Sequence, residues 1–173
     1  MASFDDFFME LALDLAHQCI PTTTAFNVGA VLVDTRVRSI DSLDKLISDK
    51  LIFTGYSREL PGNTHAEQVC LMKHEKSQLP ISDYILYTTM EPCTERLSGN
   101  ITCTQNILNR QGNQLNIIKL VIGCAEPVHF VKHQGIGALQ DIGIGIQRLI
   151  KYEKQSLSVN ANVLTTAAIP TKI

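Results

Sequence analysis

Short apolar runs that suit buried strands alternate with stretches of helical periodicity along this chain of 173 residues. Val28–Val33 is a valine-rich apolar run, and Leu51–Tyr56 is its expected hairpin partner. Two further strands are predicted at Tyr84–Met90 and at the isoleucine-rich segment Ile117–Gly123. Strands that alternate with helices predict an α/β domain, in which a sheet lies between helical layers.

The first helix is predicted near the start of the chain. Apolar residues recur at helical spacing from Phe4 to Cys19. Ser3 and Asp6, three positions apart, resemble a capping box at the beginning of this helix. Pro21 cannot continue a helix and is expected to end it.

Three more helices are predicted between and after the strands. One should begin near His65, with Thr64 as its N-cap, and run to about Lys76. The others are expected at Cys103–Arg110 and Ile136–Asp141. Each follows a predicted strand or its loop, so the start of a helix lies close in sequence to the end of a strand.

Length and composition predict one domain with a full-sized core. Hydrophobic residues make up 45% of the chain and charged residues 18%, which is typical of a globular protein. We expect the domain to occupy residues 1–150 and residues 151–173 to form a C-terminal extension whose structure the sequence does not predict. The polar segment Asp34–Lys50 is long for a hairpin loop and should be a surface excursion.

Charge and cysteine content argue against several classes of partner. The net charge is -2, so no overall positive field attracts nucleic acid. No apolar segment approaches the ~20 residues that span a bilayer, and Asp5 and Asp6 argue against a signal peptide. Five irregularly spaced cysteines fit a reduced protein better than a disulfide scaffold. We expect a cytoplasmic protein, with the nucleus left open as a second location, that binds neither membrane nor nucleic acid.

Three residues at predicted strand-to-helix junctions form a candidate zinc site. His65 opens one helix, Cys93 follows a strand, and Cys103 comes after a gap of nine residues at the start of another helix. One imidazole and two thiolates supply three protein ligands and leave a fourth position for water, as in a catalytic rather than a structural zinc site. The ion lowers the pKa of that water toward neutrality, which makes it a nucleophile.

Glu67 is the candidate proton carrier. It lies two residues after His65, and at a helix start this offset turns its side chain away from the metal-ligand direction. A carboxylate in that place can take a proton from the water and pass it to a nitrogen of the substrate.

Other interpretations of the same residues remain at this stage. A structural zinc site would need a fourth protein ligand, for which Cys70 and Cys124 are available without a characteristic spacing. A disulfide between Cys93 and Cys103 is disfavoured in a cytoplasmic chain. Singly, a His-x-Glu or a Pro-Cys pair occurs by chance, so the prediction depends on their combination and order.

The combined motifs resemble a known family. His-x-Glu followed by Pro-Cys and a further Cys is the signature of zinc nucleobase deaminases. The stretches NVGAVLVD, FTGYSRELPGNTHAE, TTMEPC and LSGN, which lie between Asn27 and Cys103, look like the cytidine deaminase-like superfamily. More narrowly they resemble the riboflavin-pathway pyrimidine deaminases, and the LSGN loop resembles their fungal and yeast type. The resemblance covers roughly Phe4 to Ile144.

The resemblance implies a fold, a cofactor and a reaction. The fold is a three-layer α/β/α arrangement around a mixed sheet of about five strands, and the cofactor is Zn²⁺. The reaction is hydrolytic deamination of 2,5-diamino-6-ribitylamino-4(3H)-pyrimidinone 5'-phosphate, which yields the pyrimidinedione and ammonia. We expect this phosphorylated pyrimidine as the small-molecule partner, and a homodimer as the assembly.

Substrate contacts are predicted around the metal. Asn27 precedes the strand that the family places beside the sugar, so its amide is expected to bind a sugar hydroxyl or the pyrimidine edge. Arg96, Ser98 and Asn100 lie in the loop between the two cysteines and offer donors to a sugar or ring. Lys132 could bind the phosphate. It lies in a segment that departs from the bacterial pattern, where Glu126, Val128, His129 and His133 replace Asp, the Asn-Pro pair and a Gly.

Two other functions remain as alternatives. One is a deaminase of nucleic acid such as tRNA, or of a free nucleotide; a nucleic-acid enzyme would need a basic surface, against which the net charge of -2 argues. The other is a non-catalytic subunit that keeps zinc for folding. The presence of Glu67 argues against it, because a scaffold has no need of a proton carrier.

Overall fold

Five strands form one mixed sheet in the computed structural model, which describes residues 3–96, 98–127, 135–161 and 163. The strands are β1 (Gly29–Asp34), β2 (Ile52–Tyr56), β3 (Asp83–Met90), β4 (Asn116–Cys124) and β5 (Gly145–Arg148). Their order across the sheet is β2-β1-β3-β4-β5. β1 is antiparallel to both of its neighbours, whereas β3, β4 and β5 are parallel. The predicted hairpin of β1 and β2 is confirmed.

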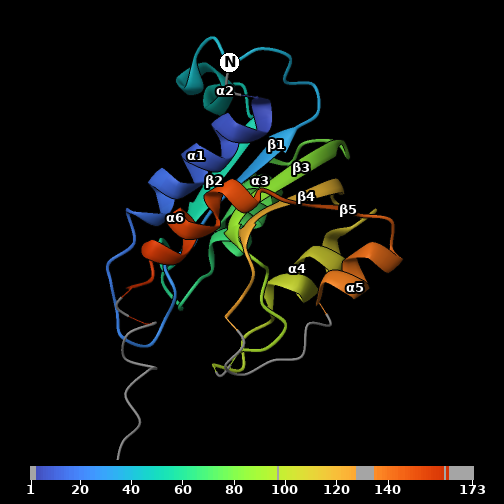
Figure 1. Ribbon diagram of the computed structural model, residues 1–173. Coiled ribbons are helices and arrows are strands. Elements are labelled where there is room, and N and C mark those ends of the chain that lie inside the picture. Colours follow the sequence, from blue (N-terminus) through green and yellow to red (C-terminus); the bar gives the residue numbers. More distant parts are fainter. Residues whose placement is uncertain (1–2, 97, 128–134, 162, 164–173) are drawn as a thin grey trace, which may run out of the picture.

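Helices cover both faces of this sheet (Figure 1). The helices are α1 (Phe4–Ala16), α2 (Leu43–Ser48), α3 (Ala66–Ser77), α4 (Cys103–Arg110), α5 (Gly135–Asp141), the 3-10 turn η1 (Ile150–Tyr152) and α6 (Glu153–Ser158). α1 and α6 lie on one face, and α3, α4 and α5 lie on the other. The predicted three-layer α/β/α fold around a five-stranded mixed sheet is therefore confirmed.

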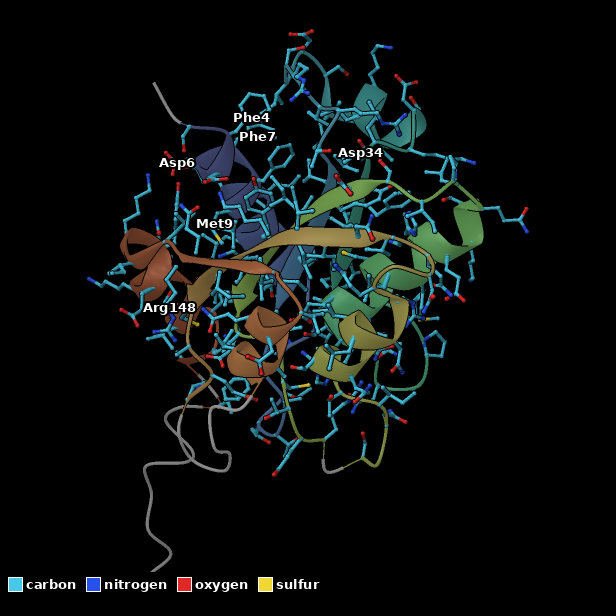
Figure 2. The ribbon with its side chains drawn as sticks, turned by 90° about the vertical axis from the view of Figure 1, so that its right-hand side faces the viewer. Phe4, Asp6, Phe7, Met9, Asp34 and Arg148 are labelled. Atoms are coloured by element: carbon cyan, nitrogen blue, oxygen red, sulfur yellow. The ribbon has the colours of Figure 1, made fainter. Side chains whose placement is uncertain are left out.

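The sheet separates two hydrophobic cores. On the α1 face, Phe8 and Met9 pack with Val31 and Tyr87 from the sheet, and Figure 2 shows Met9 among the α1 side chains beside the strands. On the α3 face, a second cluster includes Cys70 and Ile107 from the helices. β1 contributes to both cores because all six of its residues are buried. Burial on both faces explains why its sequence is a continuous apolar run rather than an alternating one.

Two glycines allow helices to approach the sheet closely. A Cβ atom on Gly29 of β1 would lie 1.9 Å from the carbonyl oxygen of Ala12 in α1. A Cβ atom on Gly55 of β2 would lie 2.4 Å from the carbonyl oxygen of Ala66 in α3. Real Cβ atoms do not come so near to backbone, so both positions require glycine. The second contact seats the beginning of α3 directly against the sheet.

Several boundaries differ from the predicted ones. The first helix ends at Ala16, before Cys19 and Pro21, although its capping box is present because Ser3 and Asp6 bond each other's backbone N–H groups. Thr64 does not cap α3, since its hydroxyl bonds both backbone groups of Leu60 instead. His65 is the N-cap residue.

Three segments have more structure than the sequence indicated. The surface excursion at 34–50 contains α2. The short strand β5 was not predicted, because only one of its four residues is strongly apolar. η1 and α6, beyond residue 149, pack on the α1 face, and Tyr152 belongs to its core. Among the described residues, no helix is long and apolar enough to cross a bilayer.

Candidate active site

His65, Cys93 and Cys103 come together where two helices begin and one strand ends. His65 is the N-cap of α3, and its backbone N–H donates to Gln68 Oε1 at 3.4 Å. Cys93 follows the end of β3 by three residues. Cys103 is the first residue of α4, which starts there because the hydroxyl of Thr102 accepts a hydrogen bond from the Gln105 N–H at 3.1 Å.

The spacing of the three side chains fits one zinc ion. His65 Nδ1 lies 3.5 Å from Cys93 Sγ and 3.4 Å from Cys103 Sγ. Zinc binds nitrogen at roughly 2.0 Å and sulfur at roughly 2.3 Å with tetrahedral angles, which places a ligand nitrogen and sulfur about 3.5 Å apart. All three ligand atoms lie within 4.8 Å of one another. The residues present therefore fit Zn²⁺.

The pKa values of the two cysteine thiols are shifted in opposite directions. The hydrogen bond with Cys103 is the largest cause that lowers the pKa of the Cys93 thiol, to about 4, and His65 lowers it further. The same hydrogen bond, together with burial, raises the pKa of the Cys103 thiol. A coordinated thiol loses its proton outright, so a bound dication would make both residues thiolates.

The remaining cysteines do not join this cluster. Cys70 is fully buried on the α3 face, and its thiol donates to the carbonyl oxygen of Ala30 at 3.3 Å. Burial raises the pKa of the Cys124 thiol to about 12. All five cysteines are free. Within the part of the chain that the structure describes, only His65, Cys93 and Cys103 form such a group, which leaves the ligand set one short of a closed structural site.

Glu67 lies beside the ligand cluster and is only 2% exposed. Its Oε2 accepts a hydrogen bond from the Cys103 thiol at 3.3 Å, and its Oε1 lies 3.2 Å from the Thr88 hydroxyl. Burial, followed by the negative charge of Cys93, raises the pKa of the Glu67 carboxyl. A carboxylate with an environment that favours its protonated form can both accept and deliver a proton.

A cavity of about 200 Å³ opens in front of these residues. Its wall includes Glu67 and the ligands His65 and Cys93. Around them lie Thr24, Ala25, Phe26, Val28, Ser57, Arg58, Asn63, Met90, Glu91, Glu95, Arg96, Ser98 and Glu126. The wall thus combines an aromatic ring, two arginines and four carboxylates around the candidate metal site.

Known proteins share both the sequence motif and the fold. Residues 43–122 match the model of the cytidine and deoxycytidylate deaminase zinc-binding region. The Rib2 deaminase of Aspergillus oryzae, solved in complex with DARIPP, is 30% identical; the match covers 95% of this chain and 100% of that one, with a TM-score of 0.67. This chain belongs to the riboflavin-pathway pyrimidine deaminase family, within the cytidine deaminase-like superfamily.

Longer relatives carry the same domain. The diaminohydroxyphosphoribosylamino-pyrimidine deaminase of Schizosaccharomyces pombe is 36% identical over 152 residues, which are 87% of this chain and 33% of that protein. The chain thus spans a third of the length of this curated relative. The bifunctional deaminase and reductase of Thermotoga maritima has the same fold at 22% identity, with a TM-score of 0.68 over 93% of this chain and 40% of that one.

The predicted substrate-binding residues occupy different places in the structure. Ser98 and Arg96 line the cavity. The Arg96 guanidinium is already engaged, because Nη1 donates to Gln68 Oε1 and the Ile101 carbonyl at 3.0 Å each, and Nη2 donates to the Asn63 carbonyl. Arg96 therefore braces the cysteine loop against the first turn of α3.

The other three predicted contacts lie outside the cavity wall or outside the described residues. Asn100 is exposed, and its Nδ2 donates to the Gly62 carbonyl at 3.2 Å. Asn27 is buried and does not line the cavity, since its amide bonds Val159 and Arg58 instead. The contact of the Asn27 amide with the sugar stays a prediction. Lys132 lies in 128–134, outside the described residues.

Sequence reasoning missed several wall residues. Phe26 has no recognisable motif of its own, and only its closeness to the predicted strand β1 could have indicated it. Glu126 departs from the bacterial pattern, and the sequence alone predicts no role for it. In the cavity, burial and then the charge of Cys93 raise the pKa of its carboxyl to about 7.

Proposed function

We propose that this chain catalyses the hydrolytic deamination of 2,5-diamino-6-ribitylamino-4(3H)-pyrimidinone 5'-phosphate, here called the ribitylamino substrate. One observation carries the proposal: a buried carboxyl, Glu67, lies between a His-Cys-Cys ligand set and a cavity. Membership of the riboflavin-pathway deaminase family supports the substrate class. The cysteine loop of this chain, with its LSGN sequence, supports the reduced, ribityl form.

The chain's residues divide the work of the reaction. His65, Cys93 and Cys103 would hold zinc, which when bound lowers the pKa of a coordinated water. Glu67 removes one proton from the attacking water and delivers a proton to the departing 2-amino nitrogen. A carbon–oxygen bond forms at C2, the carbon–nitrogen bond there breaks, and ammonia leaves the pyrimidinedione. Because Glu67 is 2% exposed, it exchanges protons with the reacting atoms rather than with bulk water.

The cavity suits a small molecule. Four of its wall residues are glutamates and two are arginines, so the wall does not offer the basic groove that a polynucleotide backbone needs. Phe26 provides an apolar ring against which a heterocycle can stack. Ser98 lies on the same wall and provides a hydroxyl donor for the polar ribityl phosphate.

Ammonia release from a panel of substrates tests the proposal. We expect turnover of the ribitylamino substrate and little or none of its ribosylamino precursor, cytidine, deoxycytidylate or tRNA. Efficient deamination of one of the last three, without activity on either pathway intermediate, would reject the proposed substrate. Zinc analysis of the same preparations should give one ion per chain.

Glu67→Gln tests the proton carrier and is the first of our predictions. The amide keeps the shape of the side chain but cannot transfer the proton, so kcat should fall by roughly 10²–10⁴-fold, with zinc content unchanged. Glu75→Gln is a matched control at the other end of α3, where Glu75 pairs with Arg110 at 2.9 Å; its kcat should stay near that of the parent. Near-normal turnover of Glu67→Gln would remove Glu67 from the mechanism.

The proposal also includes assembly and location. We infer a homodimer, to be checked by light scattering after size-exclusion chromatography, and a cytoplasmic location with the nucleus as a second compartment. Five free cysteines support a reducing compartment. Cell fractionation is the direct test of location.

A further inference from the structure

A buried asparagine near the C-terminal end of the described chain holds the backbone of a residue next to the cavity. Asn160, just after α6, is 1% exposed. Its Oδ1 accepts a hydrogen bond from the Asn27 N–H at 2.6 Å, and its Nδ2 donates to the Asn27 carbonyl at 3.3 Å and the Ser156 carbonyl at 3.0 Å. One side-chain amide thus pairs with both backbone groups of Asn27, as a neighbouring strand would.

The side chain of Asn27 in turn bonds the backbone next to Asn160. Its Nδ2 donates to the Val159 carbonyl at 3.1 Å, and its Oδ1 accepts from Arg58 Nη2. Asn27 and Asn160, 133 residues apart in sequence, therefore bond each other's segment. We call this set of contacts between Asn27 and residues 159–160 the asparagine clamp. The bonds that Asn160 makes are buried, so the loss of its side chain would leave unsatisfied polar groups in the interior.

The asparagine clamp lies directly behind the cavity wall. Phe26 and Val28, the neighbours of Asn27 in the chain, both line the cavity, whereas Asn27 does not. Arg58 Nη1 donates to the Phe26 carbonyl at 3.0 Å, and the Ser57 hydroxyl accepts from the Val28 N–H at 3.1 Å. The loop that carries the aromatic ring is thus fixed from β2 on one side and from the end of α6 on the other.

We propose that Asn160 is a positioning residue of the deaminase active site: its amide fixes Asn27 and thereby holds Phe26 against the bound pyrimidine. The inference rests on the proposed function and extends it to a residue far from the metal ligands in sequence. A purely helical role does not account for the contacts, because only the bond to Ser156 belongs to the end of α6, and the other two go to Asn27.

Kinetics of Asn160 variants give the first test. Asn160→Asp keeps an acceptor for the Asn27 N–H but places a carboxylate oxygen against two carbonyl groups, and Asn160→Ala removes the contacts without adding charge. We expect KM for the ribitylamino substrate to rise about tenfold or more, which corresponds to ~1.4 kcal/mol of substrate binding, with kcat within about threefold and zinc content unchanged. A displaced cavity wall raises KM, whereas a smaller fraction of folded protein lowers only the apparent kcat. Comparing the two constants therefore distinguishes the two causes.

Leu46→Ala is the matched control. Leu46 is a buried residue of α2, which joins the ends of β1 and β2 that point away from the cavity. This variant should lower Tm as much as the Asn160 variants or more, while KM stays at the parent value. An Asn160→Asp enzyme whose Tm falls but whose KM is that of the parent would overturn the proposal.

A fluorescent reporter tests the asparagine clamp without any activity measurement. The chain contains no tryptophan, so Phe26→Trp places a single one in the cavity wall. Combined with Asn160→Asp or Asn160→Ala, this tryptophan should become about twofold more accessible to acrylamide and lose anisotropy; combined with Leu46→Ala, it should not. Equal quenching in all backgrounds would reject the positioning role. Failure of the parent to deaminate the ribitylamino substrate would reject the proposed function, and the fluorescence would still decide on the clamp.

Discussion

At the scale of single residues, one hydroxyl explains how Glu67 can exist in two protonation states. Thr88 Oγ1 lies 2.9 Å from the Met90 carbonyl and 3.2 Å from Glu67 Oε1. A hydroxyl has only one proton to donate but can accept as well. When Glu67 is ionised, Thr88 donates to it; when Glu67 is protonated, Thr88 donates to Met90 and accepts from Glu67. Thr88 therefore supports the carboxyl before and after each proton transfer.

Thr88→Val should lower kcat for the ribitylamino substrate by about tenfold, because a lost hydrogen bond of roughly 1.4 kcal/mol in the transition state has that effect on rate. Zinc content should not change, since Thr88 is not a ligand. Thr88→Ser restores the hydroxyl and should recover most of the rate in the same steady-state assay. A valine variant as fast as the serine variant would show that the contact has no part in catalysis.

At the scale of elements, the backbone of α1 packs directly against Gly29, the first residue of β1. Gly29→Ala would bring a methyl group to 1.9 Å from the Ala12 carbonyl and 2.6 Å from the Ala16 nitrogen, so helix and strand would have to separate. We expect a loss of about 3 kcal/mol or more in the free energy of unfolding, and a fall in Tm of about 6–12 °C, measured by urea and thermal denaturation.

Gly137→Ala in α5 is the matched control for this element. Apart from its chain neighbours and the backbone of its own helix, no described atom lies within 4 Å of the position of its Cβ, so the added methyl meets open space. Because alanine favours a helix more than glycine does, this variant should be neutral or slightly more stable. Equal Tm values for the two variants would contradict the close-packing explanation.

The sequence predicted the elements with strong local patterns and missed those fixed by distant contacts. β1, β3 and β4 are apolar runs and were found within a residue or so of their bounds. β5 has four residues and gains its place from pairing with β4, which no local pattern reveals.

The same division holds within the candidate site. His65, Glu67, Cys93 and Cys103 have a characteristic spacing, and the structure brings them together. The partners of Asn27 lie at Arg58 and at residues 159–160, so its role depends on contacts over more than 130 positions. Local sequence could not predict these distant partners of its side chain.

At the scale of the whole molecule, the cavity lies at one end of the sheet and the ion pair of a buried aspartate lies at the other. β3, β4 and β5 end near the cavity, and Arg148 at the end of β5 pairs with Glu91 at 3.5 Å. Asp34, at the opposite end of β1, is fully buried and pairs with Arg36 at 2.8 Å. Figure 2 shows Asp34 and Arg148 far apart on the molecule. The candidate site thus lies at one end of the sheet, and the ion pair of Asp34 lies at the other.

His74 makes stability depend on pH at that second end. Its Nε2 lies 3.1 Å from the Tyr84 hydroxyl, and burial is the largest cause that lowers the pKa of its imidazole. The unfolded chain therefore binds a proton at this histidine below pH ~6.5 more readily than the folded chain does. The free energy of unfolding should fall as the pH drops through this range.

Urea unfolding between pH 7.5 and 5.5 checks the expected sign. In His74→Gln the side chain no longer titrates, so its stability should change less with pH than that of the parent. Metal binding adds its own pH dependence to both proteins, and the difference between the two curves removes it. A variant with the same pH dependence as the parent would contradict the assignment to His74.

All five cysteines are buried, which limits the rate at which electrophiles and oxidants can react with their thiols. Cys19, Cys70 and Cys124 are buried, so reagents in solution have little access to their thiols in the folded chain. Cys93 and Cys103 lie at the cavity end, where a bound zinc ion would occupy their sulfurs. Loss of the metal, rather than loss of the fold, would therefore be the first event that exposes the chain to alkylation, and an intact metal site would act as the protein's protection against oxidative damage.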